Sequence, residues 1–179
     1  MKKLIVAIAA AFLMIGCSST PQEKSADKLI EMQMLKKKYL KDNIPAGMGI
    51  GVSTNEQLAL EMADQNARVD LAKVIDAQTK ALVKNFKEDV NDQVAEHFQT
   101  TSKTVVDTHM SGATLTDVQV ETTADGHFKV YGVMALNANL VEELVKSLQA
   151  SGTYDDAIAG KIRAAASKAY TELDGETAK

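Results

Sequence analysis

Residues Ala46–Val52 read AGMGIGV, an alternation of small and larger apolar residues. Strict alternation places Met48, Ile50 and Val52 on one face of a strand and three glycines on the other. Because glycine has no side chain, the glycine face lets another backbone or helix approach very closely. A phosphate loop is disfavoured, since the dinucleotide fingerprint needs its third glycine further along and no P-loop lysine follows. We therefore expect a strand that packs closely against a neighbouring element.

A long helix is expected directly after this strand. A capping box starts it in either of two registers, Ser53 with Glu56 or Thr54 with Gln57. Its inward stripe advances by steps of three and four residues and comprises Leu60, Ala63, Ala67, Leu71, Ile75, Gln78, Leu82, Phe86 and Val90.

The length of this helical pattern predicts an interruption. An unbroken helix from Glu56 to Phe98 would be about 65 Å long, longer than a small sheet could cover. We therefore predict a kink or short break around residues 89–92, followed by a second helical piece that contains Val94 and Phe98. A straight overhang would offer an assembly surface.

The apolar pattern changes to a period of two after Gly112. It predicts a strand over residues 116–122, a hairpin turn at Ala124–Gly126 and a returning strand over residues 128–136. Helices are expected at residues 26–41, 137–149 and 154–173. The sequence therefore predicts an α+β fold in which a small three-stranded sheet packs against the long helix. The chain order of this core is strand, long helix, strand, strand, helix. An N-terminal helix and a C-terminal helix complete the fold.

The N-terminus has the pattern of an export signal. Two lysines precede the apolar run Leu4–Leu13, which is too short for a membrane span of about twenty residues. Gly16 directly before Cys17 resembles the lipobox of bacterial lipoproteins, although Met14 stands where that motif prefers leucine. The resemblance implies cleavage before Cys17, which then carries an S-diacylglycerol and an N-acyl chain and forms a stable membrane anchor. The alternative is a plain secretory signal followed by a free cysteine.

Residues beyond the anchor bear on localisation and organisation. Ser18 is not aspartate, and the sorting rule for lipoproteins of the enteric type then implies the outer membrane. The lysines Lys36–Lys38 and Lys41 either complement the dipole at a helix C-terminus or contact anionic lipid headgroups. The predicted organisation is a signal peptide at 1–16, a lipidated tether at 17–25, an N-terminal helix and linker at 26–45, a core domain at 46–150, and a C-terminal helix and tail at 151–179.

Three segments together resemble a known family. They are the run Gly47–Val52, the helical stretch Ala63–Ala72 and the late strand Val130–Met134, which resemble small bacterial outer-membrane lipoproteins typified by the Helicobacter twenty-kilodalton lipoprotein antigen. Flagellar basal-disk lipoproteins are among its relatives. The resemblance covers residues 46–148 and implies a strand, helix, strand, strand, helix domain at the outer membrane, sometimes built into rings or surface structures. It carries over no catalytic residue.

Composition and motifs give little support for an enzyme. Without the signal, 18 of the 20 basic residues remain against 24 acidic ones, so the mature net charge near −6 argues against a nucleic-acid partner. Cys17 is the only cysteine, which excludes a disulfide framework and a thiolate metal site. No serine lies in a nucleophile elbow, and no cofactor-binding motif is present.

Three histidines (His97, His109 and His127) and one arginine remain as candidates. His109 follows Asp107 and His127 follows Asp125, a repeat that could donate metal ligands if the fold joined the two pairs. We nevertheless predict no metal site, because Asp125 has a turn role. Arg68 either forms an ion pair with Asp64 or has a buried bidentate role.

The sequence therefore predicts a non-enzymatic, lipid-anchored envelope protein with a structural or assembly role. Its expected partners are the membrane, further copies of itself or other envelope proteins, and flagellar association is one option. A periplasm-facing small-molecule or metal-binding protein is the alternative. Uncovered apolar residues on the sheet would favour assembly, whereas convergence of His109 with His127 would favour metal binding.

Overall fold

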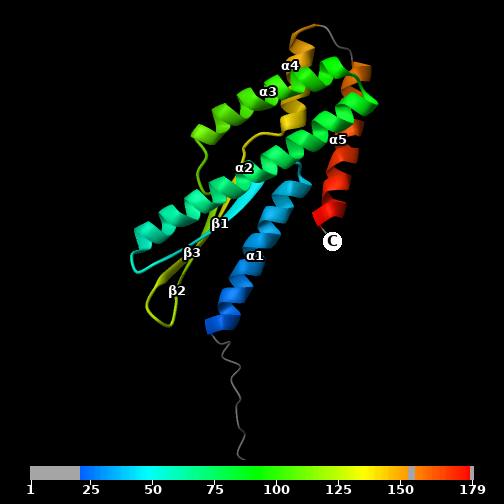
Figure 1. Cartoon of the computed structure of the whole chain (residues 1–179). Helices are drawn as coiled ribbons and strands as arrows, with labels where there is room; N and C mark the ends of the chain where they lie inside the picture. The colour runs from blue at the N-terminus through cyan, green and yellow to red at the C-terminus, as the bar shows by residue number, and fades with distance from the viewer. Residues whose placement is uncertain (1–20, 153–155, 178–179) are drawn as a thin grey trace, which may run out of the picture.

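A three-stranded antiparallel sheet with the order β1-β3-β2 lies between two helices that cover its opposite faces (Figure 1). The computed structural model describes residues 21–152 and 156–177. The fold is α+β, as predicted. In chain order its elements are α1 (Pro21–Lys41), β1 (Ala46–Ser53), α2 (Glu56–Asp89), α3 (Asp92–Ser111), β2 (Asp117–Thr122), β3 (Phe128–Ala135), α4 (Leu140–Ala150) and α5 (Asp156–Thr177).

The glycine face of β1 packs directly on the backbone of α2. A Cβ atom added to Gly49 would lie 2.0 Å from the carbonyl oxygen of Ala63 and 2.3 Å from the amide nitrogen of Ala67. Gly47 and Gly51 meet the same helix at equally short distances. The predicted close approach is therefore confirmed, and α2 occupies this face of the strand.

The opposite face of the sheet is covered by α1. Met32 of this helix packs with Tyr131 and Val133 of β3, and Met48 and Ile50 of β1 join the same cluster. The predicted strand face is therefore largely closed, although Val52 at its end remains 44% exposed.

The N-cap of helix α2 is Asn55, one residue after Thr54 and two after Ser53, so neither predicted capping box forms. Asn55 has extended backbone angles, and its side chain accepts a hydrogen bond of 3.0 Å from the backbone N–H of Leu58. Asparagine is among the best N-cap residues because its short carbonyl group reaches this N–H. Ser53 instead accepts a hydrogen bond from the backbone N–H of Asn55.

The predicted break in the long helical pattern is confirmed at Val90 and Asn91. The Asn91 side chain caps α3 by accepting a hydrogen bond of 2.8 Å from the N–H of Val94. Helix α3 then folds back onto α2 and also packs on α4 (Figure 1). Phe86 and Phe98 meet edge to face across this turn, with ring centroids 5.2 Å apart. Among the described residues, α2 and α3 therefore form no straight overhang that could serve as an assembly surface.

The two ends of the described chain differ from the predicted boundaries. Helix α1 begins at Pro21, so residues 21–25 of the predicted tether are helical. Proline is well tolerated at the first helical position because its missing N–H has no partner there. Helix α5, which was predicted to lie outside the core domain, contributes Ile162 and Ala165 to the same core cluster as α2 and α4.

Candidate functional site

Strand β2 forms an edge of the sheet beside an apolar groove. Within the described part of the chain, it pairs only with β3. Val118 lies opposite Gly132 and Val120 lies opposite Val130, so both valines share the face on which α2 packs. They remain 44% and 40% exposed, respectively.

A groove of about 430 Å³ runs between these valines and the start of α2. Leu60 of α2 and Val130 of β3 line its apolar part, together with Val118 and Val120. A second hollow, which includes Leu115, continues along the same side of α2. The β2 edge and this groove together form what we call the edge surface, defined by Leu60, Leu115, Val118, Val120 and Val130.

The two outer edges of the sheet are protected to different extents. At β1, Asn66 donates a hydrogen bond of 2.7 Å to the carbonyl oxygen of Ile50. The N–H of Met48 donates one of 2.8 Å to the carboxylate of Asp70, which also forms an ion pair of 2.6 Å with Lys36. Side chains from α2 therefore occupy backbone groups along the β1 edge, as expected for an edge protected against pairing.

Protection at β2 comes from a single lysine of α1. Lys28 donates a hydrogen bond of 2.9 Å to the carbonyl oxygen of Val120 and lies 3.9 Å from the carboxylate of Glu121. A lysine at a sheet edge discourages pairing with another chain. Its flexible side chain can nevertheless move aside, which makes β2 the more accessible edge for strand addition.

Arg68 forms the predicted ion pair and also makes a two-donor contact with backbone, although its side chain is half-exposed rather than buried. It lies 3.3 Å from Asp64 on the preceding turn. It also donates hydrogen bonds of 2.7 Å to the carbonyl oxygen of Met110 and 2.8 Å to that of Ala113. Two donors from one planar guanidinium suit this task better than a lysine ammonium would. Arg68 therefore fixes the C-terminal end of α3 against α2.

The three histidines do not converge. His109 lies in a hollow beside Ala135 and Leu136, at one end of β3, whereas His127 directly precedes the other end. Eight residues of strand place these ends about 25 Å apart. His127 instead pairs with Asp125 at 3.0 Å, and the Nε2 atom of His97 lies 2.9 Å from the Ser147 hydroxyl. Among the described residues, no group of three potential ligands is placed to hold a metal ion.

The lysine cluster of α1 divides into two groups. Lys36 is tied to Asp70 and is therefore structural, whereas Lys37, Lys38 and Lys41 are exposed at the end of the helix. Cys17 lies outside the described residues. No helix in the described ranges is long and apolar enough to cross a bilayer.

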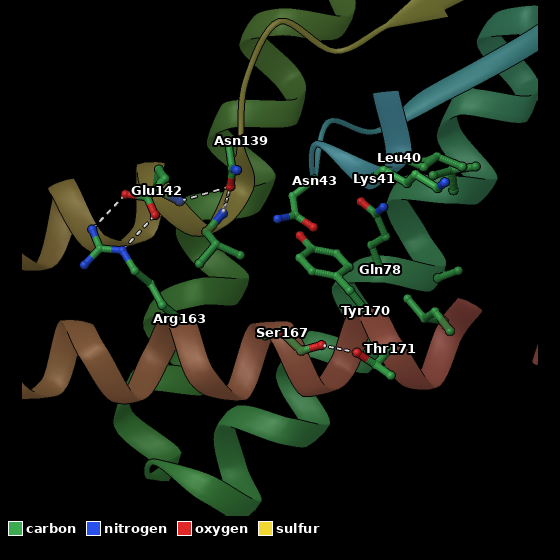
Figure 2. Close-up of a pocket in the computed structure, with 14 residues that line it drawn as sticks. Leu40, Lys41, Asn43, Gln78, Asn139, Glu142, Arg163, Ser167, Tyr170 and Thr171 are labelled. Carbon is green, nitrogen blue, oxygen red and sulfur yellow. Dashed lines mark hydrogen bonds and ion pairs between the residues drawn. The ribbon is translucent and has the colours of Figure 1, made fainter. Parts of the chain in front are cut away.

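A separate cavity of about 540 Å³, away from the edge surface, lies where α1, α2, α4 and α5 meet (Figure 2). Its walls carry polar side chains over an apolar lining that includes Val74 and Val141. At one end, Arg163 forms two hydrogen bonds of 2.8 Å with the Glu142 carboxylate. Hydrogen bonding to Arg163 lowers the pKa of Glu142, and burial raises the pKa of Tyr170.

Sequence reasoning did not find this cavity as a site. The helical periodicity places Gln78 in the apolar stripe of the long helix. A polar residue among leucines and alanines is the one local feature that could have indicated a site here. Asn43, with a positive φ of 58°, and Tyr170 come from other parts of the chain. No local pattern connects these three residues.

The chain matches no protein-family model, no curated protein and no solved structure at a significant level.

Proposed function

We propose that this protein is a lipid-anchored outer-membrane lipoprotein with a structural or assembly role, and that copies of it associate through the edge surface. The observation that carries the proposal is the β2 edge, where Val118 and Val120 stay exposed beside an apolar groove. Proteins often associate by strand addition, in which a strand of one chain pairs with an accessible edge strand of another and apolar residues beside the edge pack together.

A second copy fits this surface because β2 can pair antiparallel with itself. Pairing centred on Val120 would place that residue opposite its own copy, and Val118 opposite Thr122. The valines of both copies would then lie on one face and extend the groove into a shared apolar strip. A two-fold contact of this kind is the commonest interface in homo-oligomers.

The anchor supports the same proposal. Lipid on Cys17 would hold the domain at a membrane surface through the short segment before α1. Confinement to that surface raises the effective concentration of copies, so a small interface can suffice. The resemblance to outer-membrane lipoproteins that build rings supports this reading, whereas the separation of His109 from His127 disfavours shared metal binding.

The test measures the mass and oligomeric state of the detergent-extracted protein. The wild type is compared with Cys17→Ser and with Val120→Lys, which places a charge at the centre of the proposed pairing. Val69→Lys is the matched control, because Val69 is a valine of α2 that is 54% exposed outside the edge surface.

The proposal expects three acyl chains and a defined oligomer for the wild type. Val120→Lys should be monomeric while Val69→Lys assembles normally. An unlipidated wild type would refute the anchor, and an oligomer that survives Val120→Lys would refute the edge surface as its interface.

A further inference from the structure

Two buried polar side chains that line the cavity between α1, α2, α4 and α5 have an atom without a hydrogen-bond partner in the protein. Gln78 is only 5% exposed, yet its Oε1 atom has no hydrogen-bond partner in the protein. The Tyr170 hydroxyl is likewise buried and has no protein partner. Native proteins rarely leave such groups unpaired, and each instance calls for an explanation.

The unpaired groups belong to one site. Figure 2 shows the polar ends of Gln78, Tyr170 and Asn43 turned toward one corner of the cavity, while the Arg163–Glu142 pair lies at the other end. The volume of about 540 Å³ lies within the range of small-molecule sites. Converging polar groups over an apolar lining are the usual composition of such sites.

We propose that this cavity binds a small ligand through a secondary amide group. An amide N–H can donate to Oε1 of Gln78 while the amide carbonyl accepts from the Tyr170 hydroxyl, so that one group satisfies both atoms. The apolar substituent beside the amide would pack on Val74 and Val141. A fully charged ligand fits less well, because the guanidinium of Arg163 is already paired with Glu142.

A secondary amide beside an apolar substituent occurs both in N-acylated amino sugars and in short peptides. The probes are therefore N-acetylglucosamine and an alanine dipeptide capped at both ends, with glucose as the sugar that lacks the amide. Each is titrated into the detergent-extracted full chain, and binding is measured by calorimetry and by saturation transfer to the acetyl methyl group.

Two substitutions test the assigned atoms. Tyr170→Phe and Gln78→Met keep the shape of the side chains but remove the polar atoms, and each should weaken binding about fivefold or more. Both variants should keep the wild-type Tm, because the removed atoms have no partner in the protein. Gln65→Met is the matched control, since Gln65 is an exposed glutamine on the same helix.

Binding of either amide probe, with weak or no binding of glucose, supports the proposal, and the probe that binds identifies the source of the amide. Equal binding of glucose and N-acetylglucosamine would overturn it. So would an absence of binding by both amide probes, or unchanged affinity in Tyr170→Phe and Gln78→Met.

Discussion

Single atoms set the tightest constraint at the contact between β1 and α2. Gly49 lies so close to α2 that a Cβ would meet backbone atoms at 2.0 and 2.3 Å. Backbone cannot move aside as a flexible side chain can, so the strand and the helix would have to separate. The requirement for glycine here is one of space.

Gly49→Ala should therefore lower the free energy of unfolding by about 3 kcal/mol, the upper part of the range for overpacked cores. Gly112→Ala is the control, because a Cβ there has nothing within 4 Å. Urea unfolding of both variants measures the difference. Equal stability of the two variants would show that β1 and α2 do not pack as described.

Two tyrosine hydroxyls provide a second comparison at this scale. The Tyr131 hydroxyl donates a hydrogen bond of 3.0 Å to Glu121, whereas the Tyr170 hydroxyl is unpaired. Tyr131→Phe should cost about 1 kcal/mol, and Tyr170→Phe should change stability by less than about 0.5 kcal/mol. Thermal unfolding without added ligand distinguishes them. A larger cost for Tyr170→Phe would mean that its hydroxyl has a structural partner.

At the scale of elements, the helix and strand assignments follow from local periodicity. The glycine alternation, the stripe of the long helix and the Asp125–Gly126 turn are all patterns within a few residues, and the structure confirms each of them. The break near Val90 was predictable from helix length alone. The N-cap at Asn55 was missed because three neighbouring residues could each cap the helix.

Contacts between distant residues could not be predicted in this way. Arg68 donates hydrogen bonds to carbonyl groups 42 and 45 residues away in the sequence. The cavity between α1, α2, α4 and α5 is lined by side chains from these four helices or their ends. Such sites depend on how whole elements pack. The sequence singled out Arg68 and placed Gln78 in the inward stripe of the long helix, but it could not show what either residue faces.

The link between α4 and α5 should depend on pH. Hydrogen bonding to Arg163 lowers the pKa of Glu142 from its ordinary value of 4.5. A carboxyl with a lowered pKa in the folded state adds stability above its unfolded pKa and loses it as the pH falls through the folded pKa.

Arg163→Gln should therefore be less stable than wild type at pH 7, and the difference should disappear as the pH falls below 4.5 and through the folded-state pKa of Glu142. The Glu142 resonance should titrate at higher pH in the variant. NMR titration and urea unfolding at several pH values provide the measurement. A difference that grows as the pH falls would contradict the assignment.

At the scale of the whole molecule, helices pack on both faces of the sheet, and side chains of α2 occupy backbone groups along β1. What remains accessible is the β2 edge, whose Val120 carbonyl is occupied by Lys28 of α1. The first helix after the proposed anchor thus supplies the group that competes with a partner strand. Association then depends on how readily this lysine leaves the edge.

Lys28→Ala should strengthen self-association of the full-length protein, with Kd lowered about fivefold, because the Val120 carbonyl becomes free for a partner strand. Lys80→Ala is the control, since Lys80 pairs with Asp76 on an exposed part of α2. Sedimentation equilibrium in detergent measures both variants against the wild type. If Lys28→Ala associates no more strongly than Lys80→Ala, Lys28 does not compete with a partner strand for the β2 edge, and the contact between copies lies elsewhere on the molecule.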